Sequence, residues 1–92
     1  MIEIIKLGAE WCGPCRMMKP VIHNLQKKYN FESSNVRITE IDIDQDPESA
    51  SKYGVRSVPT IVFLKDSVVS TIKVGLLSEQ QIEAFIENMK NS

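Results

Sequence analysis

The sequence has few of the residues that mark specialised classes of protein. It holds two cysteines, one histidine and one tryptophan, and only 7% of its residues are aromatic. No apolar run approaches the roughly 20 residues of a membrane-spanning helix. The net charge is −1 and the sequence has no long basic run, so it offers no electrostatic basis for binding nucleic acid or an anionic membrane. Two cysteines and one histidine cannot complete the usual four-ligand zinc site, and we expect no metal.

The length and the N-terminus indicate one small domain inside the cell. The chain has 92 residues, 42% hydrophobic and 25% charged, which suits a single globular domain over residues 1–92. Residues 1–6 lack the basic segment and long apolar stretch of a secretory signal, so we expect a cytoplasmic location. Cellular reductants keep cytosolic thiols reduced, so a lone pair of cysteines there points to chemistry and not to a structural cross-link.

The spacing of apolar residues predicts the element order β-α-β-α-β-β-α. Helix starts are marked by Asp46 followed by Pro47, and by the capping pair Ser78 and Gln81. A long helix joins the first two strands, which should therefore be parallel, whereas a short turn joins the last two as an antiparallel hairpin. The expected fold class is α/β, a four-stranded mixed sheet flanked by helices, with strands at 2–7, 36–43, 60–65 and 68–74 and a long helix over 14–30.

The two cysteines lie where a strand meets a helix, in the segment Trp11-Cys12-Gly13-Pro14-Cys15. Cysteine reacts as the thiolate, and the free N–H groups and dipole of a helix N-terminus stabilise a thiolate at Cys12. Cys15 lies one helical turn further on, within reach of a disulfide and on the apolar side of the helix. We predict that Cys12 is the nucleophile and Cys15 the shielded resolving thiol, with Gly13 and Pro14 tuning the pair.

These residues resemble the active-site segment of the thioredoxin family. Positions 11–15 match that family's pentapeptide, and the two residues before them also fit. Further matches follow in the same order and cover nearly the whole chain, at 43–47, 53–56, 58–60 and 73–75. The resemblance implies the thioredoxin fold and a thiol–disulfide oxidoreductase that binds no prosthetic group and uses its own disulfide.

The resemblance also implies a substrate-binding surface beside Cys12. It makes Pro59 a cis-proline packed next to the cysteines, and because proline has no N–H, the backbone of Val58 stays free to pair with an extended peptide. Trp11, Val74 and Gly75 would complete a shallow apolar groove. For Val74 and Gly75 a plain strand end and turn fits the sequence equally well.

The chain departs from the family at its N-terminus. The usual family chain opens with an extra strand and helix, whereas here the active-site strand starts at Ile2. What remains matches the minimal, glutaredoxin-like form of the fold. That form predicts the sheet order 36–43, 2–7, 60–65, 68–74, with the long helix and the C-terminal helix on opposite or partly shared faces.

A second departure concerns the charged residues beneath the cysteines. Most relatives have a buried aspartate where Lys6 stands, and many have a lysine where Glu40 stands. We expect a charge-reversed pair, because a buried lysine needs a carboxylate partner, with Glu40 as the proton acceptor for Cys15. The alternative is that Lys6 extends to solvent and Glu40 is a surface residue. Gly8 replaces a common aromatic residue and should open space near the cysteines, and His23 should be a solvated surface residue.

Three functions stay open on the sequence alone. The first is a general protein-disulfide reductase that thioredoxin reductase recycles with electrons from NADPH, with clients such as ribonucleotide reductase or peroxiredoxins. The second is a glutaredoxin-like, glutathione-dependent dithiol donor. Against it, Leu76-Leu77-Ser78 follow Gly75, in place of the second glycine and acidic residue that typically hold glutathione in that family. The third is a non-redox binding subunit, which has no need of two reactive thiols. We expect a monomer that binds neither nucleic acid nor membrane.

Overall fold

The computed structural model describes residues 1–30 and 35–91, whose strands form a four-stranded mixed sheet. The strand order is β2-β1-β3-β4, with β1 parallel to β2, β1 antiparallel to β3, and β3 antiparallel to β4. The predicted element order, sheet order and strand directions are all confirmed. The elements are β1 (Ile2–Gly8), α1 (Gly13–Tyr29), β2 (Val36–Asp42), α2 (Pro47–Lys52), β3 (Thr60–Lys65), β4 (Val68–Val74) and α3 (Glu79–Lys90).

The helices begin where their capping residues stand. Cys12 itself caps α1, so this helix starts at Gly13, one residue earlier than predicted. Asp46 caps α2 by accepting a hydrogen bond from the backbone N–H of Ser49 at 3.2 Å. At the start of α3, Ser78 and Gln81 bond each other's backbone N–H groups, which confirms the predicted capping box.

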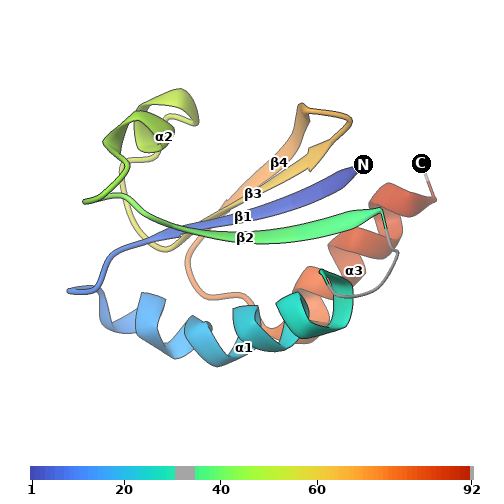
Figure 1. Cartoon of the computed structure of the whole chain (residues 1–92), viewed down its shortest axis with the longest axis horizontal. Coiled ribbons are helices and arrows are strands. Elements are labelled where there is room, and N and C mark those ends of the chain that lie inside the picture. Colours follow the sequence, from blue (N-terminus) through green and yellow to red (C-terminus); the bar gives the residue numbers. More distant parts are fainter. Residues whose placement is uncertain (31–34, 92) are drawn as a thin grey trace.

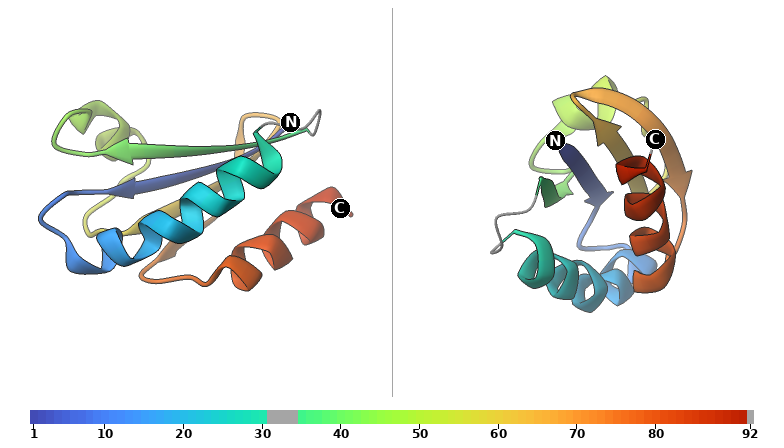
Figure 2. Two further views of the ribbon diagram at one scale, coloured as in Figure 1. Left: turned by 60° about the horizontal axis from the view of Figure 1, so that its bottom comes forward. Right: turned by 90° about the vertical axis from the view of Figure 1, so that its right-hand side faces the viewer.

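Helices α1 and α3 cover the same face of the sheet, and α2 lies on the other side (Figures 1 and 2). The apolar stripes of α1 and α3 meet every second residue of the central strands in one core. The shared face resolves the arrangement that the sequence left open. The fully buried members of this core include Ile4, Met18, Ile22, Leu25, Ile38, Ile61, Phe63, Ile82 and Ile86.

The turn between β1 and α1 lies at the end of the sheet that is remote from both termini (Figure 1). The peptide bond between Val58 and Pro59, just before β3, is cis as expected. The N–H of Gly75, just after β4, donates to the carbonyl of Pro59 at 2.9 Å and joins these two loops. Over residues 1–30 and 35–91, no helix is both long enough and apolar enough to cross a membrane.

Candidate active site

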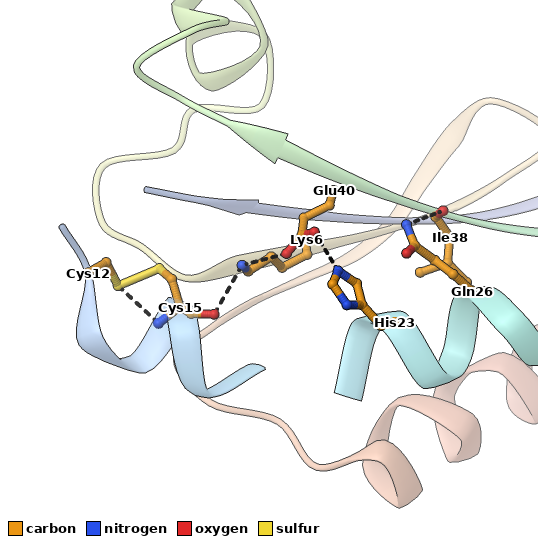
Figure 3. Close-up of polar contacts among 7 residues, drawn as sticks. All are labelled: Lys6, Cys12, Cys15, His23, Gln26, Ile38 and Glu40. Atoms are coloured by element: carbon orange, nitrogen blue, oxygen red, sulfur yellow. Dashed lines mark hydrogen bonds and ion pairs between the residues drawn. A yellow bond between two sulfur atoms is a disulfide. The ribbon is translucent and has the colours of Figure 1, made fainter. Parts of the chain in front are cut away.

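A disulfide joins Cys12 and Cys15 at the N-terminus of α1 (Figure 3). The Cα atoms of the two cysteines are 5.2 Å apart, so the disulfide closes within the first turn of the helix. The sulfur of Cys12 accepts a hydrogen bond from the backbone N–H of Cys15 at 3.2 Å. This donor and the dipole of α1 both favour negative charge on the Cys12 sulfur once the disulfide is opened.

The two cysteines differ in exposure in the predicted direction, but only slightly. Cys15 is 1% exposed and Cys12 is 6% exposed. Cys12 is less accessible than its place at a helix tip suggests, because Ala9 and Val58 pack against the pair. The carbonyl oxygen of Val58 lies 3.7 Å from the Cys12 sulfur. These neighbours therefore restrict access to the Cys12 sulfur.

Trp11 is an exposed aromatic side chain beside the disulfide. It is 68% exposed, yet its Nε1–H donates to Oδ2 of Asp44 at 2.8 Å, so the ring is held against the loop that follows β2. Val74, the last residue of β4, is also exposed, at 67%. The sequence carries no local signal that pairs Trp11 with Asp44, because the two residues meet only when β1 and β2 are aligned in the sheet.

Lys6 and Glu40 meet beneath the disulfide. They are direct neighbours in the parallel register of β1 and β2, and their side chains point to the α1 side of the sheet (Figure 3). Nζ of Lys6 lies 3.1 Å from Oε2 of Glu40 and donates to the carbonyl oxygen of Cys15 at 3.2 Å. The Lys6 side chain is only 3% exposed, and that of Glu40 is 23% exposed. Lys6 therefore does not extend to solvent.

His23 extends this polar cluster outward. Its Nε2 lies 3.6 Å from Oε1 of Glu40, so Glu40 stands between His23 and Lys6 (Figure 3). The His23 side chain is 57% exposed, as predicted, but it is also an ion-pair partner of Glu40 whenever it is protonated. A spacing of four residues from Lys19, which lines the same pocket as Glu40, is the signal that would have placed His23 on this flank of α1.

A pocket of about 270 Å³ lies behind the disulfide, and neither cysteine lines it. Its lining is mostly polar or charged and brings together residues of β1, α1 and β2. A pocket of this size and polarity is suited to hold water. The lining includes Lys6, Gly8, Glu10, Lys19, Glu40 and Asp42.

The two residues between the cysteines serve the first turn of α1. Pro14 stands in this turn, where its missing N–H costs no helical hydrogen bond. A Cβ on Gly13 would meet nothing within 4 Å, so this glycine leaves open space next to Cys12. Within the described ranges, no three side chains of His, Cys, Asp or Glu come together as a metal site requires.

Known proteins share both the sequence and the fold of this chain. The family model described as Thioredoxin matches residues 2–88. A thioredoxin of Pseudomonas aeruginosa is 37% identical over 84 residues, which cover 91% of this chain and 75% of that protein. A thioredoxin of Rickettsia bellii is 38% identical over 85 residues, which cover 92% and 78%.

A solved structure of a mutant thioredoxin from Halobacterium salinarum superposes with a TM-score of 0.83 at 35% identity, covering 96% of this chain and 74% of that one. The disulfide at the head of α1 and these similarities lead to the same conclusion. This chain belongs to the thioredoxin family and is a dithiol–disulfide oxidoreductase.

Proposed function

We propose that this chain is a general protein-disulfide reductase of the cytoplasm, working as a monomer with one domain over residues 1–92. The observation that carries the proposal is the position of Cys12 as the cap of α1, with the buried Cys15 in bonding contact. This arrangement makes one sulfur a nucleophile toward an external disulfide and keeps the other for the second step.

The reaction proceeds in two exchanges. The Cys12 thiolate attacks one sulfur of the client disulfide, forms a mixed disulfide, and releases the first client thiol. The Cys15 thiolate then attacks the Cys12 sulfur and releases the second client thiol, which takes up a proton. Two electrons and two protons pass to the client, and the chain is left as the Cys12–Cys15 disulfide seen in the structure.

The proposed client surface consists of Trp11, Val58, Pro59, Val74 and Gly75. Its support is the short distance from the Val58 carbonyl to the Cys12 sulfur and the hydrogen bond that ties Gly75 to Pro59. An extended client segment that pairs with the backbone of Val58 would present its sulfur next to Cys12. The exposed faces of Trp11 and Val74 would supply apolar contact on either side.

We further propose that Lys6 and Glu40 assist Cys15, while Gly13 and Pro14 shape the turn between the cysteines. The ammonium group of Lys6 favours the thiolate of Cys15, and Glu40 accepts the proton that Cys15 loses. Nζ of Lys6 contacts both the Cys15 carbonyl oxygen and Oε2 of Glu40, so the carboxylate lies one contact away from the resolving cysteine.

The variant Glu40→Gln tests the proton-acceptor role. It keeps the side-chain shape but removes the base, so we expect disulfide reduction to slow about tenfold or more, with an altered rate profile between pH 6 and 8. Stopped-flow kinetics with one client disulfide measure the rate. Glu10→Gln is the matched control, since Glu10 lines the same pocket and should leave the profile unchanged. A wild-type profile for Glu40→Gln would remove Glu40 from the mechanism.

After each client is reduced, the Cys12–Cys15 disulfide must receive two electrons from a reductant. We propose that thioredoxin reductase recycles the oxidised chain with electrons from NADPH, and that disulfide-containing proteins, with ribonucleotide reductase and peroxiredoxins as candidates, are the clients. The expected result is rapid reduction of the Cys12–Cys15 disulfide by reductase and NADPH and slow reduction by glutathione. Absorbance of NADPH and a thiol-labelling gel measure the two reactions. Preference for glutathione would support the glutaredoxin-like alternative, because that class takes its electrons from glutathione.

A further inference from the structure

Gly8 lies at a crowded point of the site. Side chains on β1 alternate between the faces of the sheet, so Ile4, Lys6 and position 8 form one row toward α1. A Cβ added to Gly8 would lie 3.0 Å from Nζ of Lys6 and 3.1 Å from the sulfur of Cys15. Real Cβ atoms rarely approach other atoms this closely. The ammonium group and the sulfur therefore share the space that a side chain at position 8 would need.

The backbone does not explain why a glycine stands here. Two glycines of the described residues, Gly54 and Gly75, have positive φ values that disfavour other residues, and Gly8 is not one of them. Gly8 is paired in the regular register of β1 with β2, where any residue fits the backbone. The property of glycine that matters at position 8 is therefore that it has no side chain.

We propose that Gly8 is a positioning residue for the exchange at Cys15: its lack of a side chain lets the ammonium group of Lys6 lie beside the Cys15 sulfur. The open space that the sequence predicts near Gly8 is present on one side only. The pocket reaches Gly8, but Lys6 fills the side toward Cys15. The proposal depends on the dithiol–disulfide activity but not on Glu40 as the proton acceptor or on any client.

The contacts of Lys6 hold its ammonium group at this point. Nζ bonds the Cys15 carbonyl at 3.2 Å and Oε2 of Glu40 at 3.1 Å, and the side chain is 3% exposed. Charges interact strongly in such a buried place. When Cys15 attacks the Cys12 sulfur, the ammonium group of Lys6 stabilises the attacking thiolate. The same charge favours the dithiol form over the disulfide, so the chain becomes a weaker reductant than one without Lys6.

The test is a double-mutant cycle of Gly8→Ala and Lys6→Met, read as the equilibrium constant of the Cys12–Cys15 disulfide with glutathione. The alanine pushes the ammonium group away from Cys15, so we expect Gly8→Ala to favour the disulfide form three- to tenfold; tenfold corresponds to about 30 mV. Lys6→Met should shift the equilibrium in the same direction. In the double variant, alanine should add less than twofold, because methionine carries no charge for the alanine to move away from Cys15.

A second measurement separates charge placement from a general structural effect. In chains with Cys12→Ser, the alkylation rate of Cys15 against pH reports its thiolate fraction. We expect Gly8→Ala to move that profile to higher pH with Lys6 present and to leave it in place with Met at position 6. An equal alanine effect in both backgrounds, or none with Lys6, overturns the proposal. If Gly8→Ala fails to fold, folding restored by Lys6→Ala, which removes both Nζ and Cε from the crowded space, supports shared space. Failure of that double variant as well contradicts it.

Discussion

Replacing Cys12 by serine is expected to abolish disulfide reduction, with a loss of about 10³-fold or more. The serine hydroxyl at the head of α1 stays protonated at neutral pH and cannot attack a client sulfur. The buried Cys15, at 1% exposure, cannot replace it because a client disulfide does not reach its sulfur. The measurement is single-turnover reduction of a protein disulfide by the pre-reduced chain.

Cys15→Ser gives the complementary result. Cys12 still attacks, but nothing resolves the mixed disulfide, so a covalent complex with the client accumulates and dissolves on addition of a small thiol. The double variant has no thiol left, since the chain contains only these two cysteines, and is the blank for both measurements. Turnover by Cys12→Ser, or a stable complex formed through Cys15, would reverse the proposed order of attack.

Glu40→Leu should destabilise the fold far more than Lys6→Met does. Without the carboxylate, the Lys6 ammonium is left at 3% exposure with the carbonyl of Cys15 as its hydrogen-bond acceptor, and we expect a loss of about 2–4 kcal/mol in the free energy of unfolding. Without the ammonium, Glu40 keeps its contact to His23 and its 23% exposure, so the loss should stay below about 1 kcal/mol.

Urea unfolding followed by circular dichroism measures both losses. A surface control is Lys28→Met, which breaks the ion pair with Glu83 at 2.8 Å where the lysine side chain is 53% exposed. That variant should change stability by less than about 1 kcal/mol. Equal losses for Glu40→Leu and Lys6→Met would show that the buried ammonium is not the group that needs its partner.

Local patterns in the sequence were sufficient for the order of elements and for the reacting pair. Asp46 and Ser78 mark helix starts, because a capping side chain accepts a hydrogen bond from the backbone N–H two or three residues further on. The spacing of Cys12 and Cys15 predicts one helical turn, and a helical turn places their sulfurs within bonding contact. These inferences depend on neighbours in the chain, so they need no knowledge of how the strands are arranged.

Pairings between distant segments were decided by the tertiary structure. Lys6 and Glu40 were proposed as partners from a resemblance, but their contact depends on the register of β1 with β2. The bond of Trp11 to Asp44, the approach of His23 to Glu40, and the crowding of Gly8 by Lys6 and Cys15 have no signal of comparable strength in the sequence. Each depends on the packing of segments that only the folded sheet and α1 bring within a few ångströms.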